Sequence, residues 1–324
     1  MEMTFEHLQK IAGSNWARKT LVSAVELEIF DKIKNGLNTV DMITKDVNAT
    51  TSRGVERLLN ACASMGFLKK EKDVFYNTEL SEKYLIKEHP DYFGDFIVMT
   101  DKLSEKWKNL SDAILKGEVD EGEMTDFNDP IFTKAMHNNA VGPAKVLGER
   151  VDFSKFNNLL DLGGGSGAYS IELTNKYPKL KATVLELEGV CKTADEYIKK
   201  LGDGSKVKTL CGDLLNDEYP KNHDVILFSQ ILHSYNIENC KKIIKKSYDI
   251  LPENGMIIIN EFILNPDKAG PVFPALFSIN MFISNNEGSA YTQEEITSWM
   301  TKVGFKDISV IPLVGPHTAV VGKK

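Results

Sequence analysis

Residues 158–167, with the sequence NLLDLGGGSG, decide the fold of this chain. An apolar strand that contains Asp161 is predicted to turn through glycines into a helix that begins near residue 167. Glycine is needed in such a loop because the chain must turn tightly and let a ligand approach its backbone, which a Cβ atom would block. The pattern therefore predicts a nucleotide-type site at the carboxyl end of a parallel strand.

The chain after residue 157 alternates between apolar strands and helical segments, which is typical of a doubly wound parallel sheet. Strands are expected at 158–162, 181–187, 206–211, 223–229, 255–262, 307–312 and 317–322, and helices at 167–177, 189–201, 237–251 and 292–303. The last two strands follow the last helix through a short link. We therefore expect an α/β, Rossmann-like sheet of seven strands that ends in an edge hairpin.

Length, charge and cysteine usage exclude several classes of protein. A chain of 324 residues favours two domains, and a net charge of −7 argues against nucleic-acid binding through bulk electrostatics. The sequence has neither a run of apolar residues long enough to cross a membrane nor an apolar signal segment at residues 1–6, so we expect a cytoplasmic protein. The cysteines lie far apart without a CxxC motif, so we expect reduced thiols and no metal site. They are Cys62, Cys191, Cys211 and Cys240.

Residues 1–90 are predicted to form a mainly helical domain. The expected helices are 21–35, 39–47 and 52–65, and the expected strands are 67–70 and 74–77. Three helices followed by a hairpin make a winged helix, and such domains often bind DNA. The third helix mixes Arg53 and Arg57 with Glu56 and has a broad apolar stripe, so we favour a dimerisation module.

Residues 91–150 are predicted to be a second helical stretch, which links the first domain to a catalytic domain over 151–324. Large apolar side chains in this stretch are expected to be mostly buried packing residues. Some of them can form one wall of a substrate pocket, and Met136 is the candidate. His137 beside it can be interpreted equally well as a pocket residue or as a packing residue.

Two acidic residues follow successive strands of the predicted sheet. Glu186 ends the second strand, where a carboxylate can accept hydrogen bonds from ribose hydroxyls. Glu188 competes for this role but lies past the strand end. Asp213 ends the third strand and can take an adenine amino group while Leu214 packs on the ring; the alternative is an ordinary turn residue. A ribose belongs to NAD and to S-adenosylmethionine (SAM) alike, so these acids do not discriminate between the two cofactors.

The fourth and fifth strands bring a histidine and a carboxylate to the same edge of the sheet. His233 follows the fourth strand, and histidine is the side chain that most often serves as a general base. Glu261 follows four apolar residues of the fifth strand, where an unpaired carboxylate would be costly. The pair therefore predicts a base with an orienting acid.

These motifs together resemble the SAM-dependent O-methyltransferase family that includes plant caffeate enzymes and acetylserotonin methyltransferase. The resemblance covers nearly the whole chain. It rests on AVELEIF at 24–30 and RLL at 57–59 through GFL at 66–68, on DLGGGSG at 161–167, on GD at 212–213, and on ILH at 231–233. It implies a homodimer, a small-molecule acceptor, SAM as the cofactor and no metal.

The resemblance also implies roles for individual residues. His233 is the general base and Glu261 one of two flanking acids, while Gly163, Glu186 and Asp213 hold the amino-acid part, the ribose and the adenine of SAM. Further cofactor candidates are Asp161, Gly165, Gly167, Leu214 and Ser229, and further acceptor candidates are Phe277 and Met281.

The chain departs from the family pattern after His233, where Ser234 and Tyr235 stand in place of the Asp-Trp of the plant enzymes, and at two further positions. The second flanking acid falls on Ala290, and a family lysine near the adenine corresponds to Ser229. The hypothesis is therefore methyl transfer to a hydroxyl of a small, partly apolar, aromatic or conjugated acceptor. The acceptor pocket is expected between residues 91–150, a loop over 264–291, and His233. The alternatives are C-methylation, a nicotinamide-dependent dehydrogenase, a ligand-sensing transcription factor and an inactive SAM-binding protein.

Overall fold

The computed structural model describes residues 4–119 and 130–324, which fall into two compact units, 1–105 and 106–324. Each unit is built around its own apolar core. The short helix η1 (Ser104–Asn109) crosses the division. The domain boundaries expected at residues 90 and 150 remain predictions.

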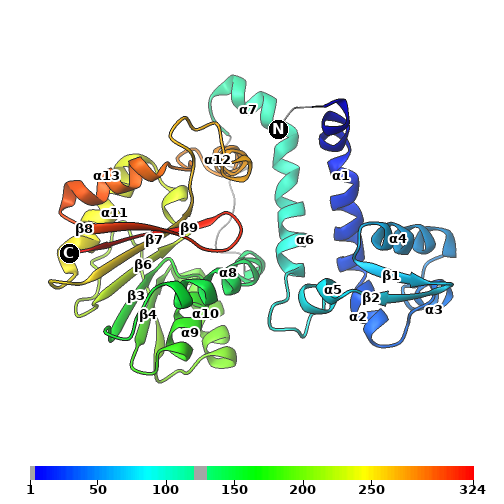
Figure 1. The fold of residues 1–324 in the computed structure, drawn as a ribbon, viewed down its shortest axis with the longest axis horizontal. Coiled ribbons are helices and arrows are strands. Elements are labelled where there is room, and N and C mark those ends of the chain that lie inside the picture. The colour runs from blue at the N-terminus through cyan, green and yellow to red at the C-terminus, as the bar shows by residue number, and fades with distance from the viewer. Residues whose placement is uncertain (1–3, 120–129) are drawn as a thin grey trace. The chain divides into compact units, whose positions relative to one another are not determined.

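The first unit consists of helices and one hairpin (Figure 1). Its helices are α1 (Phe5–Glu26), α2 (Ile29–Lys34), α3 (Val40–Asp46), α4 (Ser52–Ser64), α5 (Glu79–Tyr84) and α6 (Gly94–Leu103). The hairpin pairs β1 (Leu68–Glu71) with β2 (Val74–Asn77) in antiparallel register. The predicted three-helix and hairpin pattern is therefore present, with α5 and α6 added after it.

The first expected helix is wrong in one respect, because the chain breaks between α1 and α2. Glu28 adopts a left-handed conformation with φ of 55°, which interrupts the helix. The break turns the chain so that Ile29 and Phe30 both enter the core, where neither is exposed. A helical repeat of apolar residues cannot reveal such a break, since the burial pattern continues across it.

The second unit is a sheet covered by helices on both faces (Figure 1). Its strands are β3 (Asn158–Leu162), β4 (Lys181–Glu186), β5 (Val207–Cys211), β6 (Val225–Ser229), β7 (Met256–Phe262), β8 (Lys306–Pro312) and β9 (His317–Lys323). Its helices are α7 (Leu110–Lys116), α8 (Pro130–Arg150), α9 (Ala168–Lys176), α10 (Glu188–Leu201), η3 (Leu232–Ser234), α11 (Ile237–Ile250), α12 (Val272–Ser284) and α13 (Gln293–Val303).

The seven strands lie in the order β5-β4-β3-β6-β7-β9-β8. Neighbouring strands from β5 to β7 are parallel, and β9 pairs antiparallel with both β7 and β8. This is the predicted Rossmann-like sheet with its edge hairpin, and the predicted strands and helices agree with the observed ones within two residues at each end. The carboxyl ends of β3, β4, β6 and β7 consequently meet at one edge, where the site lies.

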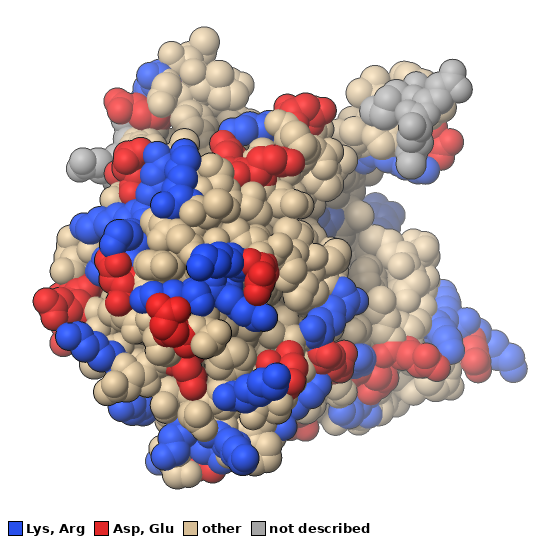
Figure 2. Space-filling model, turned by 60° about the vertical axis from the view of Figure 1, so that its left-hand side comes forward, with Lys and Arg blue, Asp and Glu red and all other residues tan. Residues whose placement is uncertain are grey.

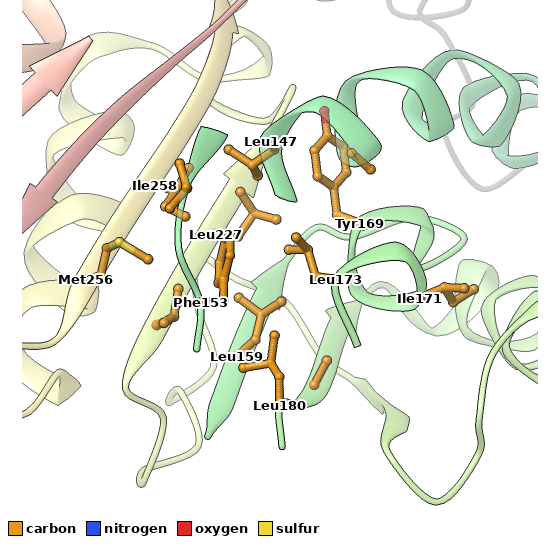
Figure 3. Close-up of a cluster of buried hydrophobic side chains, with 14 of the residues drawn as sticks. Leu147, Phe153, Leu159, Tyr169, Ile171, Leu173, Leu180, Leu227, Met256 and Ile258 are labelled. Atoms are coloured by element: carbon orange, nitrogen blue, oxygen red, sulfur yellow. The ribbon is translucent and has the colours of Figure 1, made fainter. Parts of the chain in front are cut away.

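Two apolar clusters cover the two faces of the sheet. One contains Leu147 from α8, Tyr169 and Leu173 from α9, and Ile258 from β7 (Figure 3). The other packs the side chains of α11 and α13 against the opposite face. Alternate residues of β7 therefore enter different clusters, as the period of a strand requires.

One expected loop is a helix. Residues 264–291 were expected to be a loop, yet α12 spans thirteen residues of it. Pro274 lies in the first turn of α12, where a proline is tolerated because the N–H that it lacks would be unpaired anyway. Pro271, the N-cap residue, and Pro274 therefore mark the start of α12 and do not prevent it.

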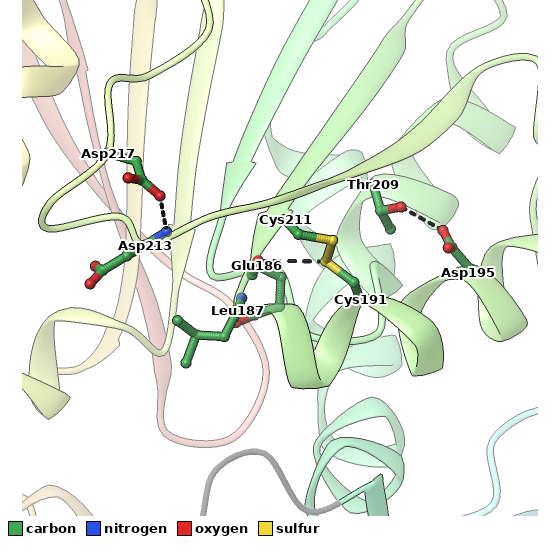
Figure 4. The surroundings of a disulfide bond; sticks show 8 residues. All are labelled: Glu186, Leu187, Cys191, Asp195, Thr209, Cys211, Asp213 and Asp217. Atoms are coloured by element: carbon green, nitrogen blue, oxygen red, sulfur yellow. Dashed lines mark hydrogen bonds between the residues drawn. A yellow bond between two sulfur atoms is a disulfide. The ribbon is translucent and has the colours of Figure 1, made fainter.

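The cysteine expectation is also wrong in part. Cys191 in α10 and Cys211 at the end of β5 form a disulfide bond (Figure 4). α10 packs against β5 and brings together residues that are twenty positions apart, so no local motif announces the bond. Cys62 and Cys240 are free and buried, and burial raises the pKa of their thiols to about 11 and about 12.

Charge is evenly mixed on the visible surface. On the face shown in Figure 2, basic and acidic side chains alternate and do not gather into a basic patch. No helix among the described residues is both long enough and apolar enough to span a membrane.

Candidate active site

The glycine loop joins β3 to α9 in a backbone conformation that glycine favours. Gly163, Gly165 and Gly167 have φ values of 66°, 55° and 76°. A Cβ atom on Gly163 would lie 2.3 Å from Ile231 Cδ1, whereas one on Gly165 would have no heavy atom of the described residues within 4 Å. The loop is therefore closed against the protein at Gly163 and open at Gly165, and the open side can admit a ligand.

Glu186 at the end of β4 contacts this loop directly. Its Oε2 accepts the N–H of Gly165 at 2.9 Å, and its Oε1 accepts the N–H of Leu187 at 2.8 Å. Burial raises the pKa of Glu186, and these two N–H groups act in the opposite direction. Each carboxylate oxygen keeps a lone pair, so the predicted ribose acceptor stands beside the glycine loop.

Asp161 lies beneath the glycine loop and is almost fully buried. Its Oδ2 accepts a hydrogen bond from Ser170 Oγ at 2.8 Å, while its Oδ1 has no partner among the residues that the structure describes. Burial raises its pKa to about 7. A Cβ atom on Gly164 would lie 2.7 Å from the carboxyl carbon, so the aspartate supports the loop from below.

Asp213 forms a local turn. Its two carboxylate oxygens accept the N–H of Leu215 and the side-chain amide of Asn216, each at 2.7 Å. Burial would raise its pKa, but these hydrogen bonds and Lys246 lower it on balance. The geometry is that of the turn residue weighed as the alternative. Leu214 beside it is buried against the same cluster as β6.

His233 and Glu261 form a buried pair at the carboxyl edge of β6 and β7. His233 Nδ1 lies 2.8 Å from Glu261 Oε2, and both residues are less than a tenth exposed. Glu261 Oε1 accepts the N–H of Ile231 at 2.9 Å, which fixes the carboxylate relative to the turn that carries the histidine. With Nδ1 donating to the carboxylate, the second ring nitrogen of His233, Nε2, can accept a proton.

Aromatic rings surround this pair. The Phe277 ring on α12 meets the His233 ring edge-on, with centroids 4.9 Å apart. It also lies 4.7 Å from the ring of Phe262 and stacks at 6.2 Å on Phe273. Met281 is buried on the same helix. Of the two α12 residues predicted to contact the acceptor, Phe277 therefore lies against His233 and Met281 lies inside the unit.

His137 is attached to the cofactor loop. Its Nδ1 lies 2.7 Å from Ser166 Oγ, and its ring stacks on Tyr197 of α10 at 4.0 Å. Burial, with a contribution from Lys200, lowers the pKa of His137 to about 4. These contacts are those of a packing residue behind the glycine loop. Met136, the other candidate on α8, is half-buried.

A polar cluster that sequence reasoning missed lies next to the pair. Asn260 on β7 contacts Tyr169, Ser229 and His317. Ser229 is the residue that corresponds to the family lysine. A signal was available, because Asn260 is a polar residue inside the apolar run that precedes Glu261. His317 could not be found in this way, because only the antiparallel pairing of β9 with β7 brings it to this edge.

The fold and the site define a class of protein. A Rossmann-like sheet that carries a glycine loop, an acid at the neighbouring strand end and a buried histidine–carboxylate pair at one edge is typical of an enzyme that binds a nucleotide-type cofactor.

Comparison with known proteins identifies the family. The model of the O-methyltransferase domain matches residues 110–306, and that of the O-methyltransferase dimerisation domain matches residues 9–87. The chain therefore belongs to the O-methyltransferase family and is a SAM-dependent methyltransferase. The prediction from the motifs is confirmed, and the dehydrogenase alternative is wrong.

Relatives match over almost their whole length. The chain is 30% identical to 3-hydroxy-5-methyl-1-naphthoate 3-O-methyltransferase of Streptomyces sahachiroi, over 95% of this chain and 92% of that protein. It is 25% identical to acetylserotonin O-methyltransferase of Bos taurus, over 98% and 97%. The crystal structure of human N-acetylserotonin methyltransferase in complex with SAM superposes with a TM-score of 0.89 at 25% identity, covering 100% of this chain and 98% of that one.

Proposed function

We propose that this enzyme transfers the methyl group of SAM to a hydroxyl of a small aromatic acceptor, with His233 as the general base. The observation that carries the proposal is the buried contact between His233 Nδ1 and Glu261 Oε2 beneath the Phe277 ring. When bound, SAM supplies a methyl group on a positively charged sulfur. The reaction is an in-line displacement, so most of the rate comes from alignment of the acceptor oxygen with that methyl group.

The base acts at a defined atom. His233 Nδ1 donates to Glu261, so the proton of the acceptor hydroxyl goes to Nε2. The carboxylate then stabilises the imidazolium that forms, as the orienting acid does in other enzymes that pair a histidine base with a carboxylate. Position 290, where the family has its second flanking acid, is an alanine in this chain, so Glu261 alone performs this function in our proposal.

The residues around the glycine loop fit SAM. The loop is open at Gly165, and Glu186 presents two carboxylate oxygens beside it, which suits ribose hydroxyls. Gly163 and Gly167 give the loop its turn, and Asp161 supports it from below. Asp213 uses its carboxylate in a turn, so we propose that this turn and Leu214 line the adenine site. Ser229 at the end of β6 is a further proposed cofactor contact.

Two observations support an aromatic acceptor. Phe262, Phe273 and Phe277 form a continuous group of rings beside His233, and planar ligands pack well on such walls. The relatives include enzymes named for a hydroxynaphthoate and for acetylserotonin. We propose Phe277 and Met281 as acceptor contacts, whereas His137 acts behind the cofactor loop.

The enzyme is proposed to be a homodimer. A dimerisation domain matches residues 9–87, and α1 exposes several large apolar side chains. Phe5, Leu8, Ile11 and Trp16 are 74%, 61%, 57% and 80% exposed. An apolar face of this kind is covered by a partner in most stable proteins. Nucleic acid is not proposed as a partner. A cytoplasmic location stays a prediction. The bond between Cys191 and Cys211 weighs against the expectation of reduced thiols that accompanied it.

A screen for product tests the proposed reaction. The purified enzyme is incubated with SAM carrying a labelled methyl group and a panel of aromatic hydroxyl compounds, each paired with the analogue that lacks the hydroxyl. We expect label in products of the hydroxyl compounds alone, each heavier by one CH2 group. Label on carbon of the hydroxyl-free analogues would contradict O-methylation and favour C-methylation.

A further inference from the structure

Lys246 on α11 is a half-buried lysine whose ammonium group binds backbone oxygens of the protein. Its Nζ donates to the carbonyls of Leu214 at 2.8 Å, Leu215 at 3.2 Å and Asp217 at 2.7 Å. An ammonium group has three N–H donors, so these carbonyls can use all of them. The same nitrogen lies 4.2 Å from the centre of the Tyr219 ring, which is a cation–π contact. The lysine is therefore held in one place, against the turn that follows β5.

Lys246 gives this turn what its own carboxylates cannot. Asp213 Oδ1 accepts the N–H of Leu215, and Asp217 Oδ2 accepts the N–H of Asp213, each at 2.7 Å (Figure 4). A carboxylate only accepts hydrogen bonds, so it can close the turn through N–H groups but not through carbonyls. Burial lowers the pKa of Lys246, whereas the charges of Asp213 and Asp217 act in the opposite direction and favour the cation.

The same turn is joined to the residues around the glycine loop. The N–H of Gly212, where the turn begins, donates to the backbone carbonyl of Glu186 at 2.9 Å. On the other side, a Cβ atom on Gly163 would lie 3.7 Å from Leu214 Cδ2, so the Leu214 side chain lies against the closed side of the loop. A shift of the Leu214 backbone would therefore move a residue that packs on the glycine loop.

We propose that Lys246 is a positioning residue that fixes the turn over 213–217 as a preformed wall of the adenosine site and so sets the affinity for SAM. The proposal rests on the proposed placement of the adenine at this turn. It assigns to Lys246 no contact with the cofactor or the acceptor, because the lysine acts through the backbone of Leu214, Leu215 and Asp217.

The expected effect is on binding and not on the chemical step. A turn that is already fixed need not be ordered when the cofactor binds, so its fixation increases affinity. The adenosine part of SAM takes no part in the bond changes, and contacts with it are the same in the ground state and in the transition state. Loss of Lys246 should therefore raise the KM for SAM and leave kcat unchanged.

Binding is measured by calorimetry with S-adenosylhomocysteine and with 5′-methylthioadenosine, which lacks the amino-acid part. Lys246→Met keeps an unbranched side chain and removes the charge and the N–H donors. We expect it to raise the Kd of both ligands about tenfold, the factor that loss of a hydrogen bond to a charged group gives. Lys245→Met is the matched control, because Lys245 is the neighbouring residue of α11 and pairs with Asp249 on the surface. We expect no change in the control.

Hydrogen exchange of the ligand-free enzyme separates positioning from general loss of stability. In Lys246→Met the amides of 213–217 should exchange faster than in the wild type, while those of β6 should exchange at the wild-type rate. If Lys246→Met does not fold, Lys246→Arg takes its place. Its planar guanidinium keeps the charge but cannot direct three N–H groups from one nitrogen, so we expect the same changes to a smaller degree.

Three results would overturn the proposal. One is a Kd for S-adenosylhomocysteine that is unchanged in the Lys246 variants. Another is a Kd raised for S-adenosylhomocysteine alone, since the effect would then lie outside the adenosine part. The third is exchange over 213–217 at the wild-type rate.

Leu214→Ala distinguishes failure of this role from failure of the adenine site itself. If Leu214→Ala weakens the binding of S-adenosylhomocysteine and Lys246→Met does not, the role of Lys246 fails and the adenine site stands. If neither variant weakens binding, the adenine is bound elsewhere and the proposed site fails with it.

Discussion

The buried carboxyl of Asp161 should make the stability of the enzyme fall as pH rises. Burial raises its pKa to about 7, with the Ser170 hydroxyl opposing and the charge of Glu186 adding to the shift. In the unfolded chain an aspartate has a pKa of about 3.9. Between these values the folded state holds a proton that the unfolded state has released, so the stabilisation is complete below pH 4 and is lost as pH rises through 7.

The magnitude follows from the two pKa values. Between pH 5 and pH 8, linkage predicts a loss of about 2.5 kcal/mol in the free energy of unfolding from this group. Asp161→Asn keeps the shape of the side chain and cannot ionise, so its unfolding free energy should lack this component. Equilibrium urea unfolding of both proteins at pH 5, 6, 7 and 8, without SAM, gives the difference directly.

A matched control isolates the effect. Asp152 is exposed, and its hydrogen bonds with Ser154 lower its pKa, so it stays ionised across the same range. Asp152→Asn should therefore give a pH profile parallel to the wild type. If the Asp161→Asn profile is also parallel to the wild type, the carboxyl is ionised at pH 5 in the folded protein and the reasoning is refuted.

Three further outcomes follow from the structure. Gly165→Val should abolish stabilisation by SAM, because the valine side chain would occupy the open side of the loop. For the wild type this stabilisation amounts to about 2.7 kcal/mol when SAM is present at 100 times its dissociation constant. A thermal shift of normal size in Gly165→Val would contradict this. Reducing the Cys191–Cys211 bond should lower the free energy of unfolding by about 3 kcal/mol, as expected for a closed loop of about twenty residues. A Cys191→Ser/Cys211→Ser protein should show no response to reductant, whereas the control Cys62→Ser should respond as the wild type does. Trp16→Glu should convert a dimer to a monomer in analytical ultracentrifugation, since it places a charge on the exposed apolar face of α1; a variant that remains a dimer would place the interface elsewhere.

The sheet could be predicted because its signals are local. Each strand is a short apolar run, and residues such as Glu186 and Glu261 end those runs where a ligand or a base would use them. Parallel pairing then brings the strand ends together whatever the details of packing. The glycine loop and the pair of His233 with Glu261 are therefore predictable from the sequence.

Other features depend on contacts between distant segments and left no local signal. The bond of Cys191 to Cys211 requires α10 to pack on β5, and the contact of Asn260 with His317 requires β9 to run antiparallel to β7. The contacts of Asp213 are also absent from the sequence pattern. Its carboxylate can serve a ligand or a turn, and the structure shows that it accepts hydrogen bonds from Leu215 and Asn216 within a turn.

The direct test of the account is the rate of methyl transfer in a single turnover. Wild type, His233→Ala, Glu261→Gln and the control His223→Gln, which alters a buried histidine at the opposite end of β6, are mixed with SAM and an acceptor identified in the screen. We predict a rate lowered by about 10² to 10⁴-fold in His233→Ala, a smaller loss in Glu261→Gln, and SAM affinity nearly unchanged in both. A His233→Ala enzyme that transfers the methyl group at close to the wild-type rate would contradict the central claim that His233 removes the acceptor proton.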